Sequence, residues 1–311
     1  MRFRPPPDLN KPVQVFDFFS GCGGTSAGLK AAGMEIALGI DLDEDAAETF
    51  HTNFPEASFM KADIRKLPTR ALERSIADIE DHPLLFSACA PCQPYSKQRG
   101  KPIAPGDKRV GLLGQLVRFI KRYDPELLFI ENVPRINDGG FLMWQFERFT
   151  RALQKLRYAV EVSVVDSRSY GVPQKRARLV LIASRLGSIS FPSPTHGPNS
   201  PNTMYSNVRE WIEDLPEISA GERHEEVPNH RAALLSELNL TRIRLTPEGG
   251  GWRDWPAALV PECHRNGFVG YSDVYGRMRW DAPASGLTTR CISYSNGRFG
   301  HPSQDRAISV R

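Results

Sequence analysis

Apolar and polar positions alternate in two different ways along the first 190 residues. Short apolar runs predict buried strands at residues 13–19, 35–41, 58–63, 83–89, 127–133, 160–166 and 178–184. Segments with helical periodicity separate them, and in one of these Ala46, Phe50 and Phe54 share a face. This alternation predicts an α/β fold with a doubly wound, mostly parallel sheet and helices on both faces. Ligands of such sheets bind at the carboxyl ends of the strands.

The pattern changes near residue 190. Residues 191–202 are rich in Pro, Ser, Gly and Asn, which predicts a linker. Residues 203–280 contain one amphipathic helix candidate, a cluster of acidic residues and the irregular stretch TPEGGGWRDWP, and their periodicity defines no fold. We therefore expect a large domain over residues 1–190, a linker and a smaller domain over residues 191–280, and a return to the large domain over residues 281–311.

Composition narrows the class of protein. A chain of 311 residues, 40% of them hydrophobic, can bury a sizeable core without disulfides. Five cysteines are an odd number and the amino terminus has no apolar segment typical of a signal peptide, so a secreted disulfide framework is not expected. No apolar run approaches the roughly 20 residues of a membrane span. We therefore predict a cytoplasmic protein with no membrane partner.

Basic residues are unevenly placed along the chain. The net charge of +4 is too small to indicate a nucleic-acid partner by itself. Residues 97–122, however, contain eight basic residues and one acid, and residues 168–185 contain no acid. Either stretch alone is equally well explained by a solvated helix face. Two such stretches beside one candidate site favour a polyanion as partner.

The segment VFDFFSGCGGTSAGLKAAG reads as a strand, a glycine turn and the start of a helix. Gly21 and Gly23 match the first two glycines of G-x-G-x-x-G, but serine stands at the third position. Asp41, at the end of the second strand, suits the two hydroxyls of a ribose, and Asp63, at the end of the third, suits an exocyclic amine. With Phe19 available to stack on a base, these strand ends predict a nucleoside pocket. The alternative is a glycine turn with two helix-capping acids.

Two cysteines follow the fourth predicted strand, in the stretch LLFSACAPCQPYS. A redox C-x-x-C normally begins a helix, whereas prolines here stand on both sides of the Cys92–Gln93 pair, and a zinc site would need a second well-spaced pair of ligands. We therefore expect no metal. Cys89, at the strand end, is interpreted as a small buried hydrophobic residue. Cys92, in a turn beside basic residues that favour its thiolate, is the better candidate for a nucleophile.

Charged side chains adjoin two further predicted strands. Glu131 lies near the end of strand 127–133, where a half-buried carboxylic acid could donate a hydrogen bond or a proton. Arg176 and Arg178 alternate with small residues in YGVPQKRARLVLIA and therefore point to the same side. Arginines so placed suit an anion or a carbonyl oxygen. The alternative is a strand edge that faces phosphate or solvent.

Four motifs, in this order and spacing, resemble the DNA cytosine-5 methyltransferase family: DFFSGCGGTSAG, APCQPYS, ENV and YGVPQKRAR. The resemblance covers residues 13–185 and resumes near YGRMRWDAPASGLTTR. It implies a Rossmann-like domain that binds S-adenosylmethionine and releases S-adenosylhomocysteine. It also implies a small target-recognition domain and the flipping of a cytosine out of double-stranded DNA.

The resemblance assigns roles to individual residues. It implies that the thiolate of Cys92 attacks carbon 6 of cytosine, that Glu131 contacts the N3 and amino edge, and that Arg178 contacts the base carbonyl. Arg176 would serve the phosphate or the catalytic loop, which is the basic stretch after Ser96. The implied cofactor contacts are Phe19, Gly21, Cys22, Gly23, Gly24, Asp41, Leu42, Asp63, Ile64 and Pro91. The implied nucleic-acid contacts are Gln93, Ser96, Lys97, Arg99, Gln174 and Arg176.

The chain departs from the family pattern at three places. Ala90 and Pro91 stand where two prolines are common, and Tyr95 replaces phenylalanine; we expect little effect from either change. The chain ends at Arg311, before the last helix and the Gly-Asn turn of the family. Three explanations stay open: a truncated sequence, a second polypeptide that supplies the missing part, or a loss of activity.

Competing functions differ in substrate or in chemistry. The leading expectation is a DNA methyltransferase of a bacterial or phage modification system, associated with the nucleoid. A transfer RNA cytosine is the second possible substrate, but the separate region 203–280 favours DNA, because a reader of sequence needs such a module. A DNA-binding subunit without catalysis is a third candidate, and an NAD oxidoreductase leaves Cys92 and Glu131 unexplained. Arg253, Trp252 and Trp255 are candidate base contacts, with buried tryptophans as the alternative.

Overall fold

The computed structural model describes residues 4–91, 111–134, 141–265 and 273–311, with the backbone alone for 141–143. The chain divides into two compact units, Met1–Val165 with Arg178–Pro192 and Asp166–Ala177 with Ser193–Arg311. The predicted division into functional domains stays a prediction. Residues 281–311, which we expected to join the large domain, belong by their contacts to the second unit. No helix in the described part of the chain is long and apolar enough to cross a membrane.

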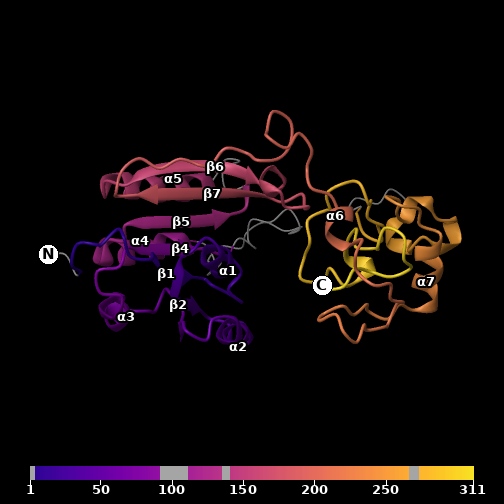
Figure 1. Cartoon of the computed structure of the whole chain (residues 1–311), viewed down its shortest axis with the longest axis horizontal. Coiled ribbons are helices and arrows are strands. Elements are labelled where there is room, and N and C mark those ends of the chain that lie inside the picture. The colour runs from indigo at the N-terminus through magenta and orange to yellow at the C-terminus, as the bar shows by residue number, and fades with distance from the viewer. Residues whose placement is uncertain (1–3, 92–110, 135–140, 266–272) are drawn as a thin grey trace. The chain divides into compact units, whose positions relative to one another are not determined.

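A seven-stranded sheet forms the centre of the first unit (Figure 1). Its strands are β1 (Gln14–Phe18), β2 (Glu35–Asp41), β3 (Ser58–Lys61), β4 (Leu84–Ala88), β5 (Leu127–Asn132), β6 (Ala159–Asp166) and β7 (Ala177–Ser184). The helices around it are α1 (Gly24–Ala31), α2 (Glu44–Asn53), α3 (Glu73–Asp78), α4 (Leu112–Tyr123) and α5 (Phe141–Lys155).

The strands follow the order β3-β2-β1-β4-β5-β7-β6. From β3 to β5 each neighbouring pair is parallel, whereas β7 runs antiparallel to β5. The predicted α/β fold with a mostly parallel sheet is confirmed. Because β7 is reversed, its amino end lies beside the carboxyl end of β5, with Asn132 opposite Leu179 and Glu131 opposite Val180.

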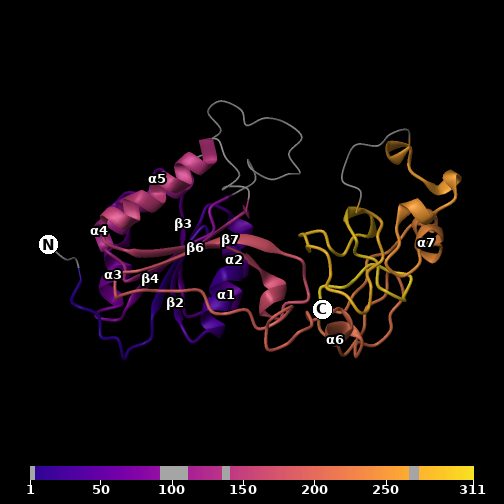
Figure 2. The ribbon, with the colours of Figure 1, turned by 90° about the horizontal axis from the view of Figure 1, so that it is seen from above.

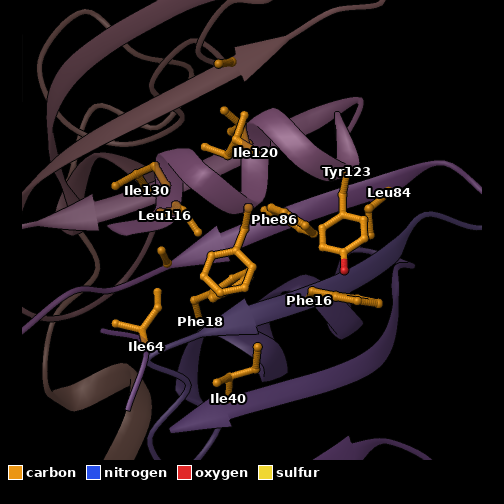
Figure 3. Packing of buried hydrophobic residues seen from close by; sticks show 14 of the residues in the cluster. Phe16, Phe18, Ile40, Ile64, Leu84, Phe86, Leu116, Ile120, Tyr123 and Ile130 are labelled. Carbon is orange, nitrogen blue, oxygen red and sulfur yellow. The ribbon is translucent and has the colours of Figure 1, made fainter. Parts of the chain in front are cut away.

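Two hydrophobic clusters cover opposite faces of the sheet. Alternate residues of a strand point to opposite faces, and accordingly Phe16 and Phe18 of β1 belong to one cluster and Val15 to the other. Helices α3, α4 and α5 contribute to the first cluster, whereas Phe50 of α2 and Phe54 just after it belong to the second. Figure 3 shows side chains of α4 lying over the aromatic rings of β1 and β4. Burial on both faces makes the sheet a rigid support for the loops at its edge.

Helix starts at this edge follow from local sequence. The side chain of Asp43 caps α2 by accepting hydrogen bonds from the backbone N–H groups of Asp45 and Ala46, at 3.0 and 3.2 Å. Helix α4 has a broad apolar face that packs on the sheet, and it lies beside α5 (Figure 2). The carboxyl ends of β1 and β2 are followed after short connections by α1 and α2.

The second unit contains little regular structure. Its α-helices among the described residues are α6 (Arg209–Ile212) and α7 (Glu237–Arg244), and short 3-10 helices lie before α6 and after α7. Buried Arg277 donates hydrogen bonds to the carbonyl oxygens of Thr246, Ile243, His301 and Gln304, at 2.7 to 2.9 Å. This unit is therefore held by side-chain to backbone bonds as well as by small hydrophobic clusters.

Candidate active site

A glycine-rich turn joins β1 to α1. Phe19, Gly21 and Gly23 have positive φ angles of 59°, 50° and 88°. Gly23 directly precedes α1, and a Cβ atom there would lie 2.4 Å from the ring of Phe54. Only glycine fits this position, for both steric and conformational reasons. The turn thus leads into a helix N-terminus of the kind that binds polar ligand groups.

Asp41 connects the end of β2 to this turn. Its Oδ2 accepts a hydrogen bond from the backbone N–H of Gly21 at 2.8 Å, and its Oδ1 accepts from Leu42 and Asp43 at 2.6 and 3.0 Å. A carboxylate has about four acceptor positions, so three are already in use. Asp41 is therefore well fixed and retains about one position for a ligand hydroxyl.

Asp63 follows β3 and is paired with a neighbour. Arg65 donates hydrogen bonds from Nε and Nη2 to both carboxylate oxygens, and this lowers the pKa of Asp63 to about 2. The carboxylate thus stays ionised at neutral pH and is an acceptor only. Ile64 beside it is buried, and its carbonyl oxygen accepts a hydrogen bond from Arg118. The sheet order brings Asp63, Asp41 and the turn after β1 to three neighbouring strand ends.

The other expected cofactor contacts differ in exposure. Cys22 is exposed in the turn, Leu42 is 60% exposed after β2, and Gly24 is the first residue of α1. Pro91 lies after β4 and lines a cavity of about 880 Å³ with residues of α4 and α5. The structure thus offers an exposed rim around the turn, whereas the contact of these residues with a cofactor stays a prediction.

Of the two cysteines after β4, the structure describes Cys89 but not Cys92. The Sγ atom of Cys89 lies 3.1 Å from the hydroxyl of Thr25, and burial raises the pKa of this thiol to about 12. Cys89 is therefore a neutral thiol, but it is partly exposed and not fully buried as interpreted from the sequence. Cys92 lies outside the described residues, together with the predicted nucleic-acid contacts Gln93, Ser96, Lys97 and Arg99.

Glu131 and Arg178 form an ion pair where the end of β5 lies beside the start of β7. Nε of Arg178 lies 2.7 Å from Oε1 of Glu131, and the two side chains are 27% and 26% exposed. The antiparallel pairing of β5 and β7 produces this contact, because it places the start of β7 beside the end of β5. The pair combines an acid with a planar donor and remains accessible to a ligand.

Gln174 and Arg176 belong to the second unit. Gln174 pairs with Ala284 in an isolated bridge, and the carbonyl oxygen of Arg176 accepts a hydrogen bond from the N–H of Ser167 at 3.0 Å. Their backbones are thus well held, and their contact with nucleic acid stays a prediction.

The candidate base readers of the second unit lie in different surroundings. Trp255 is buried, and its Nε1 donates to the hydroxyl of Thr246 at 2.8 Å. The alternative interpretation, a buried tryptophan, therefore holds for Trp255. Trp252 is partly exposed, stacks on His264 at 4.9 Å and lies under the guanidinium of Arg253 at 4.4 Å.

Comparison with known proteins assigns the chain to a family. The family model described as C-5 cytosine-specific DNA methylase matches residues 13–311. The chain belongs to this family. The predicted resemblance and the enzyme class, DNA cytosine-5 methyltransferase, are thereby confirmed.

Relatives of this methylase are similar over most of its length. It is 39% identical to the Type II methylase M.HgiDII of Herpetosiphon aurantiacus, over 96% of the chain and 81% of the relative. It is 30% identical to the Type II methyltransferase M1.HphI of Haemophilus parahaemolyticus, over 96% and 75%. A solved prophage-encoded DNA modification methyltransferase of E. coli is 18% identical, with a TM-score of 0.69 over 96% of this chain and 86% of that one. The last similarity supports the fold.

Sequence reasoning missed three contacts of this methylase. Arg65 pairs with Asp63, Thr25 contacts Cys89, and Ser26 donates to Asp17 at 2.7 Å. A signal existed for Asp17, because an acid in the middle of the apolar run VFDFF is unusual for a buried strand. The contact of Thr25 with Cys89 joins residues that are distant in the sequence, and no periodicity reveals it.

Proposed function

We propose that this methylase modifies carbon 5 of a cytosine flipped out of double-stranded DNA, with S-adenosylmethionine as methyl donor and a covalent adduct of Cys92 at carbon 6. The observation that carries the proposal is the ion pair of Glu131 and Arg178. A carboxyl group held by a guanidinium, both about one quarter exposed at the end of the central strands, suits the polar edge of a pyrimidine ring.

The residues at the ends of β1, β2 and β3 fit S-adenosylmethionine. The glycine-rich turn lets its backbone approach a ligand closely, and Asp41 retains an acceptor position for a ribose hydroxyl. Asp63, ionised and acceptor only, suits an exocyclic amine, and Phe19 suits the face of a base. When bound, S-adenosylmethionine supplies an electrophilic methyl group.

The chemistry on cytosine falls to Cys92, Glu131 and Arg178. Addition of the Cys92 thiolate to carbon 6 makes carbon 5 enamine-like and able to accept a methyl group. Glu131 binds the N3 and amino edge and stabilises the charge that develops on the ring, while Arg178 orients Glu131 and contacts the base carbonyl. Loss of the carbon 5 proton and expulsion of Cys92 then restore the aromatic ring.

Double-stranded DNA is the proposed partner, and a Type II modification system is the proposed setting, because the similar proteins carry Type II names. The second unit is the proposed reader of the target sequence. Its irregular loops and Trp252, stacked with Arg253 and His264, offer side chains of the types that contact bases.

The test is transfer of label from S-adenosylmethionine to duplex DNA of mixed sequence. We expect incorporation into duplex DNA that transfer RNA does not suppress, and none with Cys92→Ala. Bisulfite sequencing of DNA from cells that express the protein should show one methylated sequence. Full incorporation by Cys92→Ala would exclude the adduct, and methylation of transfer RNA alone would exclude the DNA substrate.

A further inference from the structure

A buried polar cluster lies beneath the glycine turn. It comprises Asp17 in the middle of β1, Ser20 in the turn, Ser26 in α1 and Ser87 in β4, each at most 7% exposed. Ser26 donates its hydroxyl hydrogen to Oδ2 of Asp17 at 2.7 Å. Within the described part of the chain, Oδ1 of Asp17 and the hydroxyl oxygens of Ser20 and Ser87 have no hydrogen-bond partner. An ionised carboxylate with so few donors would be costly to bury.

Physical surroundings favour the neutral acid at this position. Burial raises the pKa of Asp17, the negative charge of Asp41 at the end of β2 raises it further, and the hydrogen bond from Ser26 offsets part of the effect. The neighbour after β4, Cys89, is a neutral thiol, because burial raises its pKa to about 12. The bond from Ser26 to Asp17 therefore joins α1 to β1, and the contact of Thr25 with Cys89 joins α1 to the end of β4.

The first turn of α1 is attached to the sheet through this cluster. Gly23 provides no side-chain cap for the helix, so Thr25 and Ser26 supply its nearby side-chain contacts, to Cys89 and to Asp17. The glycine-rich turn just before α1 contains Gly21, whose N–H donates to Asp41. A shift of α1 away from β1 would therefore move the N–H groups and the carboxylate proposed to contact the cofactor.

We infer that Asp17 is a positioning residue for the cofactor turn, acting through Ser26 on the start of α1. The inference rests on the proposed function, because it requires that S-adenosylmethionine binds at this turn. It assigns to Asp17 a role in affinity for the cofactor and none in the chemistry on cytosine. Asparagine at position 17 should serve equally well, because its amide is neutral and has an oxygen that can accept the hydrogen bond from Ser26.

The experiment measures binding of S-adenosylhomocysteine by calorimetry, and steady-state kinetics, with the full chain. Ser26→Ala removes one hydrogen bond and should weaken binding and raise KM for S-adenosylmethionine about fivefold, with kcat unchanged. Asp17→Ala should weaken binding at least as much, whereas Asp17→Asn should bind like the parent protein. Ser75→Ala, the same change in α3, is the matched control and should have no effect.

The outcomes separate the inference from the proposed function. Absence of binding by the parent protein would reject the cofactor site itself. Binding by the parent and equal binding by Ser26→Ala would overturn the inference, even if that variant melts at a lower temperature. If Asp17→Asn and Asp17→Ala weakened binding of S-adenosylhomocysteine equally, the inference that Asp17 acts as a neutral acid would be overturned. Circular dichroism checks that each variant is folded. If Asp17→Ala does not fold, Ser26→Ala and Asp17→Asn still decide the test.

Discussion

Arg178 contacts Glu131 across the one antiparallel pairing among the strand pairs with assigned register, with Nε and Oε1 2.7 Å apart. The acid comes from the end of β5 and the guanidinium from the start of β7, so neighbouring strands fix both backbones. Both side chains are about one quarter exposed, at 26% and 27%. The sheet therefore presents a preformed acid–guanidinium pair at its edge, with little flexibility to lose on binding a base.

Arg178→Lys should lower kcat while the fold is kept. Lysine retains the charge but not the planar set of donors that holds Glu131, and loss of a charged hydrogen bond predicts a decrease of roughly 10- to 100-fold. Arg185→Lys is a matched control, because Arg185 pairs with Asp124 at the other end of β7 with similar exposure. Methylation assays with both variants check this. Equal activity of the two would contradict a role for Arg178 at the reacting base.

Cys89→Ala should leave kcat for DNA methylation unchanged. Burial raises the pKa of the Cys89 thiol to about 12, so it carries almost no thiolate at pH 8 and cannot serve as nucleophile. For the same reason Cys89 should resist alkylation by iodoacetamide at pH 8, as judged by mass spectrometry of tryptic peptides. Exposed Cys22 provides the internal positive control for labelling. Rapid alkylation of Cys89 in the folded protein would contradict this assignment.

Gly23→Ala should destabilise the first unit and abolish cofactor binding. Gly23 and Gly33 share a φ of 88°, but only at Gly23 does a Cβ atom meet a neighbour, the Phe54 ring at 2.4 Å. Gly33→Ala, with nothing within 4 Å, should lower the free energy of unfolding by about 1 kcal/mol from backbone strain alone. Gly23→Ala should lower it by about 2–4 kcal/mol, because overpacking is added. Urea unfolding checks both values, and equal losses would contradict the clash.

Asp41→Asn should weaken binding of S-adenosylhomocysteine about tenfold or more, which corresponds to roughly 1.4 kcal/mol. Asparagine has one acceptor oxygen, so its NH₂ group would face the N–H of Gly21 or those of Leu42 and Asp43. Asp43→Asn is the control, since its single capping oxygen is equally well supplied by asparagine. Calorimetry checks this. Tight binding by Asp41→Asn would show that the carboxylate is dispensable.

The second unit should lose stability below pH 6.5 because of His301. Burial and the charges of Arg306, Arg277 and His230 lower the pKa of His301 to about 3, whereas an unfolded histidine titrates near 6.5. The contribution is therefore complete above pH 6.5 and lost as the pH falls toward 3, because the unfolded chain takes up the proton. At pH 5 the loss is about 2 kcal/mol.

His301→Asn should remove this pH dependence. The asparagine oxygen can accept the N–H groups of Ser303 and Gln304, which Nδ1 of His301 accepts at 3.3 and 3.0 Å. Tryptophan fluorescence during urea unfolding reports the second unit, which contains Trp211, Trp252, Trp255 and Trp280. His51→Asn, a change at an exposed residue of α2, is the control and should leave the loss in place.

The first unit was largely predictable because burial on both sides of a sheet leaves a direct mark on the sequence. Each predicted strand has a counterpart, and Asp41 ends β2 as expected, whereas Asp63, expected to end the third strand, lies two residues beyond β3. The reversal of β7 was not predictable, since an apolar run looks the same in either chain direction. The contact between Arg178 and Glu131 depends on that reversal and was therefore not visible from spacing.

The second unit was less predictable because much of its order comes from single side chains. Arg277 binds four carbonyl oxygens in two backbone segments, 243–246 and 301–304, and no periodic pattern accompanies it. One amphipathic helix was expected within residues 203–280, without a defined position, whereas the described residues of that range contain both α6 and α7. Trp255 and Trp252 are three residues apart in the sequence, but one is buried and the other partly exposed, and only the three-dimensional packing separates them.

The position of Arg178 is set by the pairing of the reversed strand β7 with β5 and does not depend on the segment that precedes β7. Hydrogen bonds to β5 fix the register at Asn132 and Leu179, so the segment between β6 and β7 can change in length or composition without moving the guanidinium. A slip of the pairing by one residue would instead turn Arg178 to the opposite face of the sheet. An insertion into that segment should therefore leave the acid–guanidinium pair in place.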